Sequence, residues 1–214
     1  MILKIGEHRM AGQINRGQAL GEHIYSLALD INNKQFLEIG TWNGQGSTKC
    51  FIDALVTRTD DYMFISLESE KGFFESATAF HQSVLGDQLQ IIHGKLIESN
   101  EVISQNLNNV QEQWLSADLN NYSSCPNVID MILEYQYDVV LLDGGEFSTY
   151  AEFLKLKEIT KTLILDDINE LKNQKVLQVL NNDSRWQAEI ISNDRNGFAI
   201  YRNVEYARDR KVRQ

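Results

Sequence analysis

The chain has 214 residues, of which 43% are hydrophobic, so it is long enough to bury the core of one domain. Its 30 acidic and 20 basic side chains give a net charge of -10, which repels nucleic acid and anionic membranes and favours a small-molecule partner. Cys50 and Cys125 have neither the spacing of a metal site nor the density of a disulfide scaffold, and no apolar run approaches the roughly 20 residues of a membrane span. We therefore expect a soluble, cytoplasmic protein with no nucleic-acid or membrane partner.

Short apolar segments alternate with longer amphipathic segments along most of the chain. Strands are expected at QFLEIG, YMFISLE, LQIIHG, YDVVLLD and KTLILDD, each of which ends on glycine or an acid. Helices are expected at residues 18–29, 46–56, 73–85, 98–114, 128–134, 150–158 and 171–180. Because strands that are buried on both faces and separated by helices form parallel sheets, the pattern predicts an α/β, doubly wound fold.

The pattern changes near the C-terminus. In RWQAEIISNDRNGFAIYRN, two alternating apolar segments flank an Asn-Gly turn, which predicts an antiparallel hairpin at the end of the sheet. The polar stretch 116–127 contains the only proline and is expected to be a surface loop. We divide the chain into an N-terminal arm and helix at 1–30, which could serve as a lid or in homo-oligomer contacts, a main domain at 31–203, and a basic tail at 204–214.

The stretch FLEIGTWNGQGSTKC follows the first expected strand and contains three glycines. Gly40 allows a sharp turn off the strand, and Gly44 permits a ligand to approach the backbone closely. Gly46, with Ser47 and Thr48, begins the next helix, whose N-terminus favours a ligand carboxylate or phosphate. In open α/β sheets, ligands bind beyond the carboxyl ends of the strands. The alternative interpretation is a plain strand-to-helix turn.

About 20 residues further on, the second strand ends at Glu68. A carboxylate there can accept hydrogen bonds from both hydroxyls of a ribose, so the turn and Glu68 together indicate a nucleoside-like ligand. This pairing suits NAD and S-adenosylmethionine equally. Taken alone, Glu68 could also be an ordinary surface carboxylate.

The spacing E-x-G-x-x-x-G-x-G-S-T, which begins at Glu38, departs from the dinucleotide pattern G-x-G-x-x-G. It resembles motif I of the class I S-adenosylmethionine-dependent methyltransferases. The resemblance extends over residues 18–202 and implies a Rossmann-like, mostly parallel seven-stranded sheet that ends in an antiparallel hairpin. It also implies S-adenosylmethionine as the cofactor, bound by Glu38, Gly40, Thr41, Gly44, Gly46, Ser47, Thr48, Glu68 and Asp143.

A second acidic group is expected at the same edge of the sheet. Asp143 ends the fourth strand, and Asp166 and Asp167 end the fifth. Because neighbouring strands lie about 4.8 Å apart, the three carboxylates should converge, repel one another and favour a hard divalent cation, most plausibly Mg²⁺. In the alternative interpretation, Asp166 and Asp167 only cap the following helix.

This acidic pattern resembles two metal-dependent branches of the methyltransferase family, the catechol and caffeoyl-coenzyme A type and the macrocin type that acts on sugars. The resemblance implies O-methylation of a small-molecule hydroxyl on a sugar, a nucleotide-sugar or a catechol-like compound. The catechol type has a catalytic lysine where this chain has Glu146, so Asp143 or Glu146 is expected to be the base. The rival functions are a nicotinamide-dependent oxidoreductase or epimerase and a non-catalytic cofactor-binding protein of the same fold.

Overall fold

The computed structural model describes residues 14–102 and 107–206. In chain order, its elements are α1 (Ala19–Leu29), β1 (Gln35–Ile39), α2 (Ser47–Leu55), β2 (Met63–Glu68), α3 (Lys71–His81), β3 (Leu89–His93), the 3-10 turn η2 (Ser99–Glu101), α4 (Asn109–Ser124), α5 (Ile129–Ile132), β4 (Tyr137–Leu142), α6 (Thr149–Leu156), η3 (Lys157–Ile159), β5 (Thr160–Asp166), α7 (Leu171–Asn182), β6 (Trp186–Ser192) and β7 (Phe198–Asn203).

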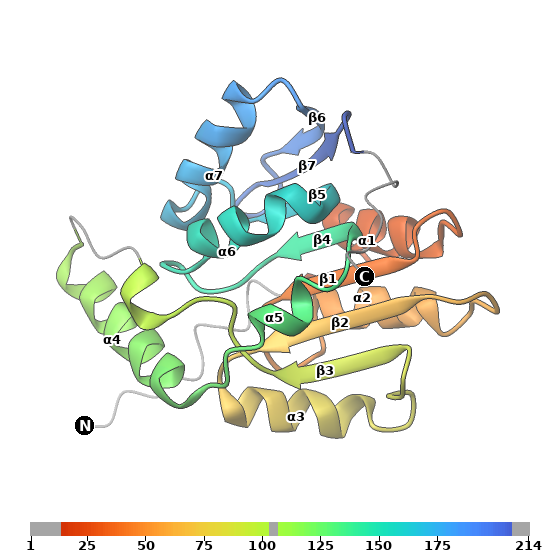
Figure 1. Cartoon of the computed structure of the whole chain (residues 1–214), viewed down its shortest axis with the longest axis horizontal. Coiled ribbons are helices and arrows are strands. Elements are labelled where there is room, and N and C mark those ends of the chain that lie inside the picture. Colours follow the sequence, from red (N-terminus) through yellow and green to blue (C-terminus); the bar gives the residue numbers. More distant parts are fainter. Residues whose placement is uncertain (1–13, 103–106, 207–214) are drawn as a thin grey trace.

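The strands form one seven-stranded sheet in the order β3-β2-β1-β4-β5-β7-β6 (Figure 1). The first five strands in this order are parallel, whereas β7 runs antiparallel to both β5 and β6. This topology confirms the expected doubly wound sheet with a C-terminal hairpin. The connections reverse direction between β1 and β4, and open α/β sheets bind ligands beyond the carboxyl ends of the strands at such a switch point.

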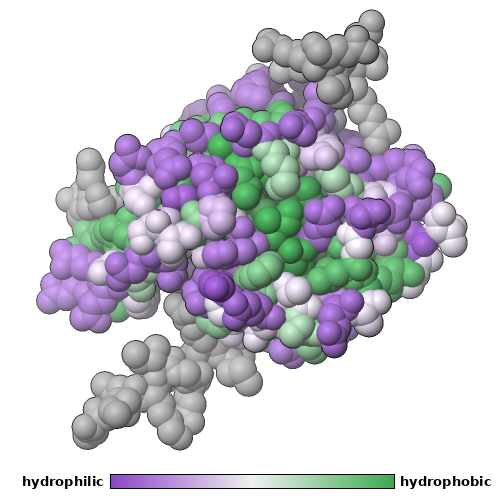
Figure 2. Space-filling model, turned by 60° about the horizontal axis from the view of Figure 1, so that its bottom comes forward, coloured by the Kyte–Doolittle hydropathy of each residue, from purple (hydrophilic) through white to green (hydrophobic). Residues whose placement is uncertain are grey.

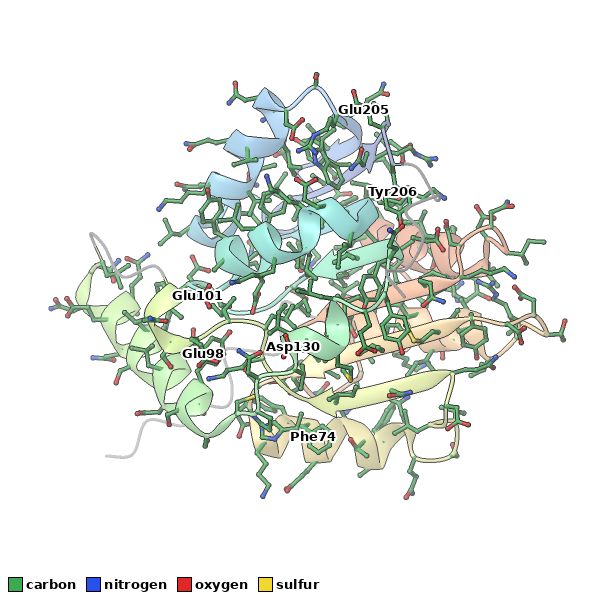
Figure 3. All side chains as sticks on the ribbon, in the orientation of Figure 1. Phe74, Glu98, Glu101, Asp130, Glu205 and Tyr206 are labelled. Atoms are coloured by element: carbon green, nitrogen blue, oxygen red, sulfur yellow. The ribbon has the colours of Figure 1, made fainter. Side chains whose placement is uncertain are left out.

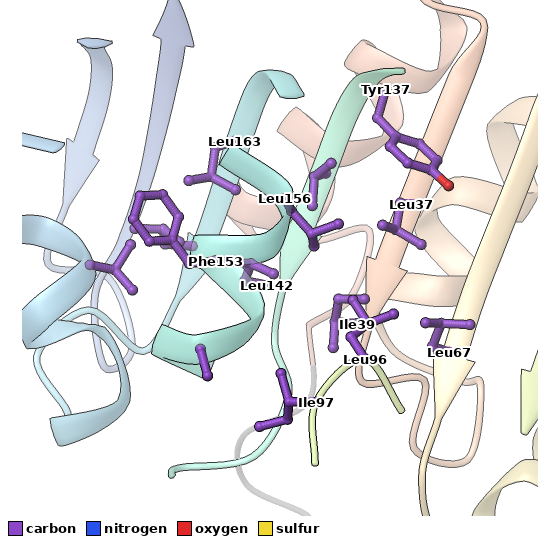
Figure 4. Close-up of a cluster of buried hydrophobic side chains, with 14 of the residues drawn as sticks. Leu37, Ile39, Leu67, Leu96, Ile97, Tyr137, Leu142, Phe153, Leu156 and Leu163 are labelled. Atoms are coloured by element: carbon purple, nitrogen blue, oxygen red, sulfur yellow. The ribbon is translucent and has the colours of Figure 1, made fainter. Parts of the chain in front are cut away.

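Successive strand residues face opposite sides of the sheet, and each side has its own apolar core. Leu37 packs in the cluster that includes Leu142 of β4 and Phe153 of α6, with further contributions from α4, α5 and α7 (Figure 4). Its neighbour Phe36 belongs to the other cluster, with side chains of α1 and α2 such as Phe51. The two cores fix β1 between two helical layers, so the turn that follows β1 starts from a rigid element.

Two predictions between residues 98 and 127 are wrong. Among the described residues, the expected helix at 98–114 is divided into the short η2 turn and the start of α4, and residues 107 and 108 are in neither; α4 begins at Asn109 and continues over most of the expected loop. Asn108 caps α4 by accepting the backbone N–H groups of Val110 and Gln111. The helix was missed because it is mostly polar and buries fully only Tyr122. Pro126 lies just beyond its end, in the short connection to α5.

The other expected helices agree with the structure to within a few residues at each end. The η2 turn is attached to α6 by an ion pair, because Lys155 Nζ lies 2.8 Å from Oε1 of Glu101, which is labelled in Figure 3.

Among residues 14–102 and 107–206, no helix has the length and apolar character needed to cross a bilayer. In the view of Figure 2, an apolar band runs between polar patches. Most of the proposed basic tail and the first part of the proposed arm lie outside the described residues.

Candidate active site

The turn after β1 requires glycine at position 40. Gly40 has a φ of +98°, and a Cβ atom at this position would lie 2.3 Å from the backbone carbonyl oxygen of Asp143. The backbone N–H of Asp143 in turn donates to the carbonyl of Ile39. The segments that follow β1 and β4 are therefore in direct backbone contact, which places Asp143 beside the glycine turn.

Gly44 is also in the left-handed region, with a φ of +76°. A Cβ atom there would lie 3.0 Å from Cβ of Ala77 and 3.1 Å from Cδ2 of His81, both on α3. His81 also forms a 2.6 Å hydrogen bond to the Gly44 carbonyl. The close approach that this glycine permits is thus the packing of α3. Gly46 precedes α2 as its N-cap residue, as the sequence predicted.

Glu38 fixes the turn from inside the protein. Its Oε2 accepts hydrogen bonds from Thr48 Oγ1 at 2.7 Å and from Ser66 Oγ at 2.6 Å, and Thr41 Oγ1 bonds to the same serine. The second oxygen of Glu38, Oε1, is buried and has no hydrogen-bond partner among the described residues. Burial raises the pKa of Glu38 to about 7, although nearby hydroxyl groups lower it in part.

Glu68 joins the turn to the end of β2. Its Oε2 accepts the backbone N–H of Trp42 at 2.7 Å, and its Oε1 accepts that of Glu70 at 2.8 Å. The residue is 7% exposed, and burial raises its pKa to about 7, against the lowering effect of these N–H groups. A carboxylate has about four acceptor positions, so Glu68 can still accept ligand hydroxyls.

The three aspartates converge as expected. Asp143, Asp166 and Asp167 offer carboxylate oxygens that all lie within 4.8 Å of one another, and we call this group the aspartate cluster. The alternative interpretation, in which Asp166 and Asp167 cap the following helix, does not hold, because the N-cap residue of α7 is Glu170. Burial, followed by the charges of Asp143 and Asp167, raises the pKa of Asp166 to about 7. Burial also raises the pKa of Asp143, against the opposing effect of Lys172.

Two basic side chains that the sequence reasoning missed pair with this cluster. Lys172 Nζ lies 3.0 Å from Asp143 Oδ1 and 3.1 Å from Asp167 Oδ2, and Arg195 Nη2 lies 3.4 Å from Asp166 Oδ2. Burial alone would lower the pKa of Lys172, but the charges of Asp143 and Asp167 outweigh it and raise the pKa, so the side chain is cationic. A lysine in the first turn of a helix is opposed by the macrodipole, and this was the signal in the sequence for a nearby anionic partner.

These basic groups bear on whether a divalent metal fits. Carboxylate oxygens are the ligands that Mg²⁺ prefers, so the donor chemistry suits the ion. The charge of the cluster is nevertheless compensated already, because a buried ammonium bridges two of the three candidate ligands. With Lys172 where it lies, the residues present do not fit a divalent cation, and the role of the aspartates as metal ligands stays a prediction.

Two further glutamates lie near the aspartate cluster. Glu146, the second candidate base, is half-buried, and burial raises its pKa. Glu152 of α6 was not predicted; it is 2% exposed, and burial raises its pKa to about 7. Its Oε1 accepts the hydroxyl of Tyr122 from α4 at 3.3 Å, whereas its Oε2 lies buried behind Gly144 without a hydrogen-bond partner among the described residues.

Backbone strain is concentrated at this edge. Among the described residues other than glycine, Trp42, Asp167 and Arg195 have positive φ values, of 50°, 55° and 57°. Trp42 lies in the glycine turn, Asp167 belongs to the aspartate cluster, and Arg195 forms an ion pair with that cluster. Such conformations cost of order 1–3 kcal/mol each and tend to persist at functional sites.

Comparison with solved structures identifies the fold. A Staphylococcus aureus structure that carries the provisional description caffeoyl-CoA O-methyltransferase matches with a TM-score of 0.59 and 17% identity, covering 87% of this chain and 83% of its own. A Bacillus cereus O-methyltransferase in complex with S-adenosylhomocysteine matches with a TM-score of 0.58 and 13% identity, over 90% and 83% of the two chains. A Podospora anserina methyltransferase bound to the same molecule matches with a TM-score of 0.55 and 16% identity, over 86% and 77%.

The fold is therefore that of the class I S-adenosylmethionine-dependent methyltransferases, as the resemblance of the glycine turn implied. No protein-family model matches the sequence, and neither does any curated protein. At these identities the likeness establishes the architecture and leaves the reaction to be argued from the site.

Proposed function

We propose that this protein is an S-adenosylmethionine-dependent methyltransferase that transfers a methyl group to a hydroxyl of a small molecule, such as a sugar, a nucleotide-sugar or a catechol-like compound. The observation that supports it best is the hydrogen bond from the Trp42 backbone to Glu68, because it makes the glycine turn and the candidate ribose acceptor one rigid unit. Asp143 lies against the same turn, so a cofactor held there would have a carboxylate beside its reactive end.

The two ends of the cofactor would meet different groups. Glu68 would accept the ribose hydroxyls, and the unpartnered Oε1 of Glu38 is the acceptor available to the ammonium of the methionine moiety. Both glutamates are buried and negatively charged when ionised, which suits the net positive charge near the sulfonium.

Methyl transfer follows from this placement. The acceptor oxygen attacks the methyl carbon in line with the sulfonium, the new O–C bond forms as the S–C bond breaks, and the bonding electron pair goes to sulfur to leave neutral S-adenosylhomocysteine. The hydroxyl proton passes to a carboxylate, for which Asp143 is the first candidate and Glu146 the second. Alignment of the two reactants supplies much of the acceleration.

A cavity of about 170 Å³ is the candidate entry for the acceptor. It is lined by Gln18, Ala19, Leu20, Asp194, Arg195 and Phe198. Arg195 connects it to the aspartate cluster through the ion pair with Asp166. The lining is mostly apolar, so the cavity favours an acceptor with an apolar face beside its hydroxyl group.

Mg²⁺ held by Asp143, Asp166 and Asp167 stays a prediction from the sequence. The donor set supports it, but the ammonium of Lys172 lies between two of these carboxylates and opposes it, so the proposed transfer includes no metal step. The cytoplasmic location, a homo-oligomer and the absence of nucleic-acid partners also stay predictions.

Calorimetry tests the proposal directly. S-adenosylhomocysteine and S-adenosylmethionine should bind with micromolar affinity, and NAD should not bind measurably. Radiolabelled S-adenosylmethionine would then be offered with panels of catechols, sugars and nucleotide-sugars, and label should appear in one class. Tight binding of NAD without binding of either sulfur compound would overturn the proposal in favour of an oxidoreductase, and cofactor binding without transfer to any acceptor would favour a non-catalytic protein.

A further inference from the structure

Lys172 lies at the centre of the aspartate cluster. It is the second residue of α7 and is 6% exposed. Its ammonium reaches Asp143 Oδ1 at 3.0 Å and Asp167 Oδ2 at 3.1 Å, which come from the ends of two neighbouring strands. The cation therefore bridges the two carboxylates that a metal ion would have to share.

The position of Lys172 is fixed by its neighbour in the chain. Asn173 is fully buried, and its side-chain amide donates to the backbone carbonyl of Asp166. This bond attaches the first turn of α7 to the end of β5, directly beside the aspartate cluster. The ammonium is consequently positioned by the attached helix as well as by its ion pairs.

Charge and distance exclude a second cation. The three carboxylates carry at most three negative charges, when all are ionised, and Lys172 and Arg195 together supply two positive charges. A Mg²⁺ ion binds oxygen at about 2.1 Å, so an ion on Asp143 Oδ1 would lie within about 5 Å of the Lys172 nitrogen. At that distance, in a partly buried site, the repulsion between the two cations is screened less than it would be in water.

We propose that the Lys172 ammonium is the resident cation of the aspartate cluster, that it excludes a divalent metal, and that it positions Asp143 for its part in the reaction. The exclusion of metal follows from the ion pairs alone, whereas the consequence for catalysis rests on the proposed function. Methyl transfer should then proceed without an added divalent ion and should be unaffected by EDTA. Lys172 is a positioning residue in this scheme, because it acts through Asp143.

The test measures metal binding and needs no acceptor. Mn²⁺ would be titrated into the full chain, and free Mn²⁺ would be followed by electron paramagnetic resonance. We expect no saturable site in the wild-type protein below millimolar Mn²⁺. Lys172→Gln removes the charge and should create one site with at least a tenfold gain in affinity, with a rise in Tm on addition of Mn²⁺ that the wild-type protein lacks.

Two variants serve as controls. Lys175→Gln removes an exposed lysine of the same helix and should create no Mn²⁺ site. Lys172→Arg keeps the charge and should also bind no Mn²⁺. A single tight Mn²⁺ site in the wild-type protein that is lost in Asp167→Asn would overturn the proposal, and this outcome can be read even if Lys172→Gln does not fold. Failure of the proposed function would instead appear as absence of S-adenosylhomocysteine binding, in a separate measurement.

Discussion

Two groups of buried or half-buried acids lie at the carboxyl edge of the sheet, and they are stabilised in different ways. In the glycine turn, Glu38 and Glu68 are held by neutral donors, namely hydroxyl groups and backbone N–H groups. In the aspartate cluster, the acids are held by the cations Lys172 and Arg195. Neutral donors leave the negative charge of the turn available to a positively charged ligand, whereas the cations cancel most of the charge of the cluster. The turn is thus suited to a sulfonium cofactor, and the cluster to proton transfer without a metal.

The largest effect of a substitution is expected at Gly40, where the glycine turn contacts the backbone of Asp143. Gly40→Ala would place a Cβ atom 2.3 Å from the Asp143 carbonyl, at a φ of +98°. Because the contact is with backbone, we expect a loss of about 3 kcal/mol or more in the free energy of unfolding, together with loss of cofactor binding. Gly86→Ala is the matched control, since its Cβ would meet nothing within 4 Å. Urea denaturation would measure the stability of the two variants, and calorimetry would measure their binding of S-adenosylhomocysteine. A Gly40→Ala protein as stable as Gly86→Ala would contradict the backbone contact.

The contrast between the two groups also explains what could be predicted from sequence. The glycine turn and Glu68 follow from local order along the chain, and the aspartates follow from strand ends that a parallel sheet must bring together. Lys172 and Arg195 reach the cluster from α7 and from the hairpin, and only the tertiary arrangement shows their partners. Similarly, α4 was missed because its contact with the core depends mainly on Tyr122 and not on a clear apolar stripe.

Asp143→Asn should separate chemistry from cofactor binding. The change keeps the size of the side chain but removes the proton acceptor, so we expect methyl transfer to fall by about 100-fold or more and the Kd for S-adenosylhomocysteine to change by about threefold or less. Glu146→Gln is the matched comparison, because it removes the second candidate base. A greater loss of rate in Glu146→Gln than in Asp143→Asn would assign the base to Glu146.

Glu38 should make the stability of the protein depend on pH. Burial raises its pKa to about 7 from an ordinary value of 4.5, so the folded protein binds this proton more tightly than the unfolded chain does. The stabilisation is complete below the pKa of the unfolded chain and is lost as the pH rises through the pKa of the folded protein, by about 1.4 kcal/mol for each pH unit that separates the two pKa values. Between about pH 5 and pH 7.5, the free energy of unfolding measured by urea denaturation should therefore fall by about 2 kcal/mol less in Glu38→Gln than in the wild-type protein. Glu75→Gln, at an exposed site on α3, should behave like the wild-type protein.

The smallest of these effects is expected at Glu68, and it tests whether the turn rather than the cluster binds the cofactor. Glu68→Gln keeps one carbonyl oxygen but sets an amide N–H₂ group against the backbone N–H of Trp42 or Glu70, and it removes the charge that would accept the ribose hydroxyls. Loss of one charge-assisted hydrogen bond costs about 1.5 kcal/mol at the lower end of its usual range, so the Kd for S-adenosylhomocysteine should rise by about tenfold. Glu70→Gln is the control, because Glu70 caps α3 beside the turn and has no part in the proposed ribose site. Adenosine should lose affinity for Glu68→Gln by the same factor, whereas methionine should not, and equal losses for both would mean that Glu68 acts by holding the turn and not by binding the ribose.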